Sequence, residues 1–195
     1  HEIIVVDGHS TDDTTRLAEQ FCDKFIKCRP GRARQMNEGA GAAGGNLLVF
    51  LHADTVLPET ASVELEDFLS DSQRVWGRFD VRFDDASLAY RTIAKLMNWR
   101  SRVSGIATGD QALFVSRALY NDAGGFPNIE LMEDIALSAA LRRIQRPICL
   151  RSKVTTSARR WQSRGIVRTI FTMWCLRIAY FFGVSPARLR LIYDR

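Results

Sequence analysis

Strand-like and helix-like segments alternate over the first 70 or so residues of the chain. Ile3–Val6 is a β-branched run that predicts a strand, and Ser10 with Asp13 forms a capping-box pattern that predicts a helix to about residue 21. The segments that follow are a strand near Lys24–Cys28, a helix from Arg32 to Ala43, a strand at Leu47–Leu51 and a helix from Pro58 to about Leu69. This alternation is typical of an α/β fold with a mostly parallel sheet.

The run from Asn46 to Asp54 joins an apolar segment directly to a carboxylate. Gly44-Gly45 and Pro58 bound the run, and its composition predicts a buried strand of a parallel sheet. In open α/β sheets, ligands bind just beyond the carboxyl ends of the strands. Asp54 is therefore placed where a metal or a phosphate-bearing ligand would bind, and the alternative is a solvated aspartate in a turn.

The second half of the chain shows a different pattern. Val75–Phe83 alternates apolar and polar residues, which predicts a half-exposed strand. The other predicted elements are a basic amphipathic helix from Ser87 to about Ser104, a strand at Ala112–Val115, a helix from Asp134 to Arg146 and a long apolar helix at Gly165–Val184. Arg168 and Arg177 fall on roughly opposite faces of that last helix. Each would cost roughly 3 kcal/mol at a bilayer centre, so a packed or interfacial helix is expected and not a membrane span.

The charges are distributed unevenly. Residues 142–195 hold thirteen of the 27 basic residues and one of the 22 acidic ones. Such a tail suits contact with anions such as phosphates or a membrane surface, and the alternative is a solvated basic face against the acidic body. Nucleic-acid binding is disfavoured because the tail has only Trp161 and Trp174 for stacking and no groove-reading motif. Four cysteines without Cys-x-x-Cys spacing are typical of reduced thiols and a cytoplasmic location, where the tail would add peripheral contact with the inner face of the membrane.

Polar groups recur at the ends of the predicted elements. Asp7 closes the first strand, and Asp110-Gln111 directly precedes the strand at Ala112–Val115. Glu133-Asp134 begins a helix, where carboxylates are also favoured by the helix dipole alone. One carboxylate beside an acceptor hydroxyl can serve as a general base.

Basic residues supply the complementary charge. Arg32 and Arg34 follow Gly31 at a helix start and suit a diphosphate, although exposed helix charge is an equal alternative. Arg160-Trp161 could clamp a pyrophosphate or stack on a sugar, or it could be an exposed cation beside a buried ring. Gly39–Gly44 matches the Gly-x-Gly-x-x-Gly dinucleotide fingerprint in the wrong context, because a helix precedes it and a strand follows; it is interpreted as a helix end.

Six motifs occur together in a fixed order, and they closely resemble family 2 glycosyltransferases of the GT-A fold. The motifs are Val5–Thr14 (Val-Val-Asp-Gly-x-Ser-Thr-Asp-x-Thr), Gly31–Gly39, Phe50–Thr55 (Phe-Leu-His-Ala-Asp-Thr), Gly109–Phe114, Gly124–Pro127 and Met132–Asp134 (Met-Glu-Asp). The similarity spans about residues 1 to 161. The His-Ala-Asp-Thr variant and the Ser-Ala-Arg-Arg-Trp tail resemble a bacterial subgroup named for arsenosugar biosynthesis.

The resemblance implies roles by position. Asp7 would contact the nucleotide base or ribose, and Asp54 would bind Mg²⁺ or Mn²⁺ as the last carboxylate of the Asp-x-Asp motif. Asp134, with Glu133 beside it, would be the catalytic base. Ser157 replaces the Gln of the Gln-x-x-Arg-Trp element, which argues against processive synthesis. The expected nucleotide-sugar-binding residues are Asp7, Arg32, Arg34, Asp54, Asp110, Gln111, Arg160 and Trp161.

Two departures from the family pattern stand out. His52 replaces the first Asp of the Asp-x-Asp motif, which leaves one carboxylate for the metal and predicts modest metal affinity. Family members open with a central strand that carries a Pro-x-x-Asn-Glu-like segment, and this sequence starts at the second strand. The resemblance therefore predicts a GT-A domain at residues 1–160 that lacks roughly 30 residues of strand, loop and helix. A helical extension is expected at 161–195.

The predicted activity is metal-assisted, inverting transfer of a sugar from a nucleotide-diphospho-sugar, preferably a UDP-sugar, to an acceptor hydroxyl. The basic tail and the apolar helix suit a lipid-linked or membrane-proximal acceptor, although a small soluble acceptor stays open, and the helix could also form a homodimer interface. Two alternatives stay open: a non-catalytic GT-A-like nucleotide-binding or interaction module, and a sugar-phosphate nucleotidyltransferase, for which no Gly-rich triphosphate loop is visible.

Overall fold

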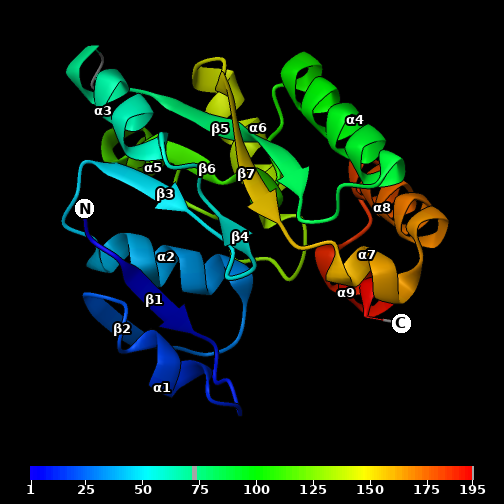
Figure 1. Cartoon of the computed structure of the whole chain (residues 1–195), viewed down its shortest axis with the longest axis horizontal. Helices are drawn as coiled ribbons and strands as arrows, with labels where there is room; N and C mark the ends of the chain where they lie inside the picture. Colours follow the sequence, from blue (N-terminus) through cyan, green and yellow to red (C-terminus); the bar gives the residue numbers. More distant parts are fainter. Residues whose placement is uncertain (72–73, 195) are drawn as a thin grey trace.

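The computed structural model describes residues 1–71 and 74–194 (Figure 1). In chain order its elements are β1 (Ile4–Asp7), α1 (Thr14–Ala18), β2 (Lys24–Lys27), α2 (Arg32–Ala42), β3 (Leu47–Phe50), β4 (Thr55–Val56), α3 (Ala61–Asp71), β5 (Trp76–Phe83), α4 (Leu88–Ser104), the 3₁₀ turn η1 (Gly109–Gln111), β6 (Leu113–Ser116), α5 (Arg117–Asp122), α6 (Glu133–Ile144), β7 (Ile148–Thr156), α7 (Arg159–Arg164), α8 (Ile166–Phe181) and α9 (Pro186–Tyr193).

The strands form two sheets. β1 and β2 are parallel and form the smaller sheet, and the larger sheet has the order β3-β6-β5-β7-β4. In the larger sheet β5 and β7 are parallel, whereas β3 with β6, β5 with β6 and β4 with β7 are antiparallel. The α/β class is confirmed, but the expectation of a mostly parallel sheet, with Leu47–Leu51 as one of its parallel strands, is wrong for β3. Its only strand partner in the described residues runs in the opposite direction.

β5 is buried on both faces from Trp76 to Val81, so the expectation of a half-exposed strand is wrong there, and only Arg82 of this strand is exposed. Its polar residues Arg78 and Asp80 are buried, and they pair with each other. The Arg78 guanidinium also donates to the Asn98 carbonyl at 3.1 Å, and Arg102 of α4 reaches Asp80 at 2.7 Å. The polar residues of β5 therefore form a layer of ion-paired and hydrogen-bonded side chains under α4. Buried charges are stable when they are paired and hydrogen-bonded.

Helices cover both faces of the larger sheet. α2, α5 and α6 pack against one face around Trp76 and Leu113, and α3 packs against the other around Phe79. α4, α7 and α8 share a further apolar cluster, and α8 packs with α9 against Leu131 before α6. These C-terminal helices gather at one end of the molecule, whereas β1, α1 and β2 lie at the other (Figure 1).

The first helix departs from its prediction. α1 begins at Thr14, and its cap residue Asp13 makes no side-chain cap hydrogen bond. The Ser10 hydroxyl and backbone N–H both donate to the Asp7 carboxylate. The predicted capping box is therefore wrong, because Ser10 closes the turn that follows β1. The small residues from Gly39 onward end α2, as expected.

β1 and β3 each present a strand edge to the same cleft. β1 pairs with β2 and β3 pairs with β6, and in the described residues neither has a strand on its other side. Residues of both strands, Ile4–Val6 and Leu47–Phe50, line one large cleft between the two sheets.

Candidate functional site

A cleft of about 1510 Å³ runs from the gap between the sheets to the C-terminal helices. The end of β3, the turn η1 and the start of α6 bring polar groups to it, and α7, α8 and α9 form its far wall. Of the residues expected to act at a site, the structure brings seven to this cleft: Arg32, Asp54, Asp110, Glu133, Asp134, Arg160 and Trp161. The cleft is therefore where we place the candidate active site.

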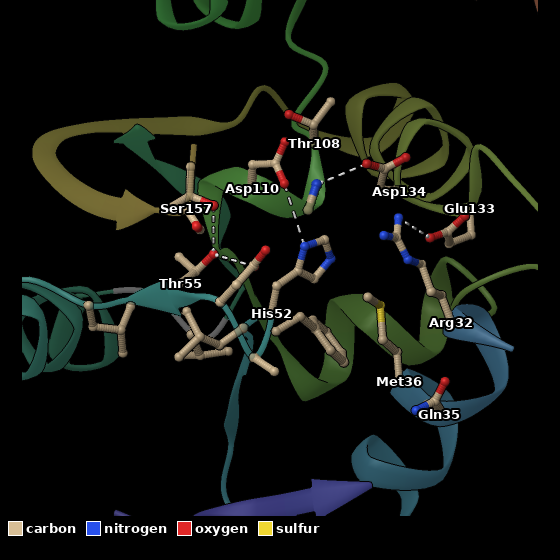
Figure 2. A pocket seen from close by; sticks show the side chains of 18 of the residues that line it. Arg32, Gln35, Met36, His52, Thr55, Thr108, Asp110, Glu133, Asp134 and Ser157 are labelled. Carbon is tan, nitrogen blue, oxygen red and sulfur yellow. Dashed lines mark hydrogen bonds and ion pairs between the residues drawn. The ribbon is translucent and has the colours of Figure 1, made fainter. Parts of the chain in front are cut away.

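His52 and Asp110 meet inside the cleft (Figure 2). The Nδ1 atom of His52 lies 3.6 Å from Asp110 Oδ1, and its Nε2 atom is buried with no hydrogen-bond partner in the described residues. The ring sits directly against Gly109, where an added Cβ would come within 2.2 Å of the imidazole. Burial alone would raise the pKa of Asp110, but contact with His52 and the charges of Arg32 and Arg160 lower it below its usual value.

The start of α6 fixes the two adjacent carboxylates differently. Asp134 Oδ2 accepts a hydrogen bond of 2.8 Å from the Gly109 backbone N–H, and Oδ1 accepts from the N–H of Ile135 (Figure 2). Glu133 is buried, with Arg32 Nη1 3.9 Å from its carboxylate. Asp134 is thus the more accessible of the pair, held at the helix N-terminus where its charge is favoured.

Glu133 gives a pH-dependent stability prediction. Burial and the neighbouring charge of Asp134 raise the pKa of Glu133 above its usual 4.5. A carboxyl whose pKa rises on folding stabilises the protein below the unfolded pKa, and this contribution is lost as pH rises through the folded pKa. Glu133→Gln should therefore gain stability relative to wild type as pH rises from 4.5 toward neutrality. Urea denaturation at a series of pH values measures this, and a constant difference across the series would contradict it.

The pairing of β4 with β7 brings Asp54 and α7 to the same end of the cleft. Thr55 lies opposite Thr156 in that pair, and the Ser157 backbone N–H donates to the Asp54 carbonyl at 3.1 Å. The Asp54 side chain is exposed toward the cleft. The Arg160 guanidinium lies 4.2 Å above the Tyr193 ring of α9, which fixes a cation on the cleft wall.

Trp161 is held by packing. Its ring meets Phe83 edge-on with centroids 5.5 Å apart, and it belongs to the cluster shared by α4, α7 and α8. The alternative interpretation from the sequence, a buried ring beside an exposed cation, fits this placement better than a free stacking platform.

Three expected site residues do not line the cleft: Asp7, Arg34 and Gln111. Asp7 is buried, and the hydrogen bond from Ser10 lowers its pKa. Gln111 is fully buried; its amide nitrogen donates to Asn98 at 3.4 Å, and its carbonyl oxygen accepts from the Thr108 N–H. In this structure Gln111 supports the turn that carries Asp110.

Two arginines without an ion pair in the described residues also line the cleft, and the sequence did not predict them as site residues. Arg100 of α4 and Arg177 of α8 both line the cleft, and neither was among the candidates. At Arg177 the available signal was a charge inside an apolar helical segment, which by itself argues only against a membrane span. Arg100 lies in a basic amphipathic helix, where one more arginine gives no signal.

A mixed sheet with covering helices, and carboxylates beyond a strand end and at a helix start that line one cleft, are features of a GT-A-type domain. The model of the family described as glycosyl transferase family 2 matches residues 1–121. The chain belongs to glycosyl transferase family 2. No curated protein sequence shows significant similarity to it.

Solved structures share the fold at low identity. Residues 1–349 of TarS from S. aureus superpose with a TM-score of 0.65 at 16% identity, covering 80% of this chain and 51% of that one. The same TarS fragment in complex with UDP-GlcNAc gives 0.64 at 16% identity, with coverages of 80% and 49%. The mannosyltransferase PcManGT from Pyrobaculum calidifontis, in complex with GDP-Man and Mn²⁺, gives 0.59 at 19% identity, with coverages of 98% and 58%. The chain thus spans about half the length of these proteins.

Proposed function

We propose that the cleft transfers a sugar from a nucleotide-diphospho-sugar to an acceptor hydroxyl with inversion at the anomeric carbon. The observation that carries this proposal is Asp134, an accessible carboxylate oriented by the Gly109 N–H inside the cleft. Asp134 takes the proton of the acceptor hydroxyl, the acceptor oxygen attacks the anomeric carbon, and the nucleoside diphosphate leaves from the opposite face. A hexosyl donor, preferably a UDP-sugar, is our expectation.

Basic residues on the cleft wall would neutralise the leaving diphosphate. Arg160 is fixed on Tyr193, and Arg32 reaches the same cleft from the N-terminus of α2. Preorganised cations stabilise charge that develops during bond cleavage without reorganising at that moment. Glu133, buried beside Arg32, acts in this proposal by positioning that guanidinium.

A divalent ion fits this site only when the donor supplies ligands. In the described residues, no three His, Cys, Asp or Glu side chains gather as a metal-binding group. Nε2 of His52 is buried against Gly109 and cannot reach an ion in the cleft, and Asp110 lies against the same ring. Asp54, which is exposed, is therefore the carboxylate that we propose to hold Mg²⁺ or Mn²⁺. Oxygens of the diphosphate and water would complete the coordination. Such an ion would neutralise the departing diphosphate.

Donor binding should therefore depend on metal and on Asp54 together. Calorimetric titration of the full-length protein with UDP and GDP is expected to show about tenfold or greater tightening when Mn²⁺ is added. Asp54→Asn should abolish most of that gain, and Asp12→Asn, which removes an exposed carboxylate outside the cleft, should leave it intact. Absence of nucleotide binding by the wild type would contradict the proposed function and support the non-catalytic module instead.

Finer assignments from the sequence are part of the same proposal. We propose that residues 1–160 form the transferase domain and that residues 161–195 form a helical extension. We also propose that a strand outside the described residues pairs between β1 and β3. The strand is supported by the two unpaired edges that line one cleft. Membership of the subgroup named for arsenosugar biosynthesis and non-processive transfer stay predictions. Nucleotidyl transfer is the less favoured alternative, and nucleic acid is not an expected partner.

The outer face of α8 suits a membrane surface better than a second copy of the chain. Exposed apolar side chains outside the cleft run along it: Val167, Phe171, Ile178 and Phe181. No described helix is both long and apolar enough to cross a membrane. Because residues 142–195 are strongly basic, two copies would bring like charges together, whereas an anionic surface would complement them. We therefore favour peripheral contact with the membrane over a homodimer through α8.

A further inference from the structure

Arg100 and Arg177 place two cations in the cleft. Nη2 of Arg100 is buried and has no hydrogen-bond partner among the described residues. In the part of the chain that the structure describes, neither guanidinium has an ion pair, and both line the cleft. Burial and the nearby charge of Arg177 lower the pKa of Arg100 to about 10, and burial also lowers the pKa of Arg177.

An unpaired cation in a partly buried site is unfavourable unless an anion joins it. The charge of Asp134 acts on both guanidinium groups, but Asp134 forms no ion pair with either of them in the described residues, and its oxygens accept hydrogen bonds from the Gly109 and Ile135 N–H groups. Planar guanidinium groups bind the oxygens of phosphate particularly well. Arg100 and Arg177 are therefore suited to bind a phosphate group that is not part of the protein.

The pair lines the same cleft as Asp134, the proposed base. The charges of Asp134 and Asp110 act on both guanidinium groups, as they also act on Arg32. In the proposed function Asp134 contacts the acceptor hydroxyl, whereas Asp54 and Arg160 hold the donor diphosphate. An anion at Arg100 and Arg177 would therefore lie in the cleft that the proposed acceptor enters.

Exposed apolar side chains adjoin the two arginines. On α4, Leu96 and Trp99 precede Arg100 by four residues and one, and on α8 Trp174 precedes Arg177 by three. All three apolar side chains line the same cleft and are more than half exposed. A nucleotide-sugar has no long apolar part, so this wall suits a different ligand.

We propose that Arg100 and Arg177 form a second anion site that binds a phosphate group carried by the acceptor, with the apolar part of the acceptor lying along Leu96, Trp99 and Trp174. This inference rests on the proposed glycosyl transfer and specifies its acceptor class. The phosphate can come from a lipid phosphate or from a small soluble phosphate ester, and the two sources differ in their use of the apolar wall.

The test uses the full-length protein with dodecyl phosphate below its micellar concentration, glycerol phosphate and UDP with Mn²⁺ as separate calorimetric probes. Arg100→Gln and Arg177→Gln should each weaken phosphate-ester binding about 10- to 100-fold. Their UDP binding should stay within about twofold of wild type. Arg91→Gln on α4 and Arg188→Gln on α9 remove exposed charges outside the cleft and should change neither affinity.

The two phosphate sources give different patterns that both support the site. Tighter binding of dodecyl phosphate that weakens in Trp99→Ala indicates a lipid phosphate, and equal binding of glycerol phosphate indicates a small ester. Unchanged phosphate affinity in both arginine variants, or a parallel loss of UDP affinity, would overturn the proposal.

Thermal melting separates binding from a structural role. Because each Gln variant removes an unpaired cation, its melting temperature should equal or exceed that of wild type, and Arg100→Lys should recover part of the phosphate affinity. A lower melting temperature with no recovery by Lys would assign the pair to the fold and also overturn the proposal. If wild type binds phosphate esters but no nucleotide, the proposed glycosyl transfer fails while the anion site stands.

Discussion

Asp134→Asn is expected to lower the rate of sugar transfer by about 100- to 10,000-fold, because an amide cannot take the proton of the acceptor hydroxyl. The side-chain oxygen of asparagine can still accept the hydrogen bond that Gly109 donates to Asp134. The start of α6 should therefore keep its conformation, and donor affinity should stay close to that of wild type. Release of the nucleoside diphosphate in the presence of acceptor measures the rate, and UDP calorimetry measures the affinity.

The control for this variant lies in the same loop. Glu130→Gln removes an exposed carboxylate four residues earlier that lies outside the cleft, and its rate should equal that of wild type. An Asp134→Asn enzyme that keeps its rate within a few-fold of wild type would remove Asp134 as the base. It would then leave the cleft without the group on which the proposed mechanism depends.

Gly77→Ala is expected to destabilise the protein by about 3 kcal/mol or more, or to prevent it from folding. A Cβ at this position would lie 2.2 Å from the Ile148 carbonyl oxygen and 2.6 Å from the Phe114 ring. Both neighbours belong to or adjoin strands paired with β5, so neither can move without breaking the centre of the larger sheet. Since domains are stable by roughly 5–15 kcal/mol, this is a large fraction of the total.

Gly41→Ala is the matched control for this substitution. Gly41 lies within α2, and an added Cβ would meet no atom within 4 Å. Alanine is the better helix former by about 1 kcal/mol, so this variant should be as stable as wild type or more stable. Urea denaturation of both variants checks the prediction, and similar midpoints for the two would show that β5 and β7 can separate at Gly77.

The local pattern of apolar and polar residues was sufficient to predict most of the helices and strands. The β-branched run before Asp7 forms β1, and the predicted helices at 87–104 and 165–184 correspond to α4 and α8. The local pattern gave the wrong burial where contacts with a distant segment of the chain cover a strand. β5 has the alternation of a half-exposed strand, yet α4 covers its polar side and neutralises it.

In the candidate site, too, some residues were predictable from the sequence and others were not. Asp54 and Asp134 were predicted because each ends or begins an element beside a ligand-binding edge, and the fold brings both to one cleft. Gln111 matched a motif position as well as they did, but the turn η1 directs it into the core toward Asn98. Arg100 and Arg177 carried no motif, and only the packing of α4 beside α8 places them together.

The sequence by itself determined the family, the alternation of elements and the carboxylates at their ends, because these depend on residue type and spacing along a few turns or strands. The tertiary structure decided which polar groups face the cleft and which are buried. It set the antiparallel partner of β3, the pairing of His52 with Asp110 and the two arginines without a partner. These contacts join residues tens of positions apart, and their energies depend on burial and neighbouring charge, which no local pattern contains.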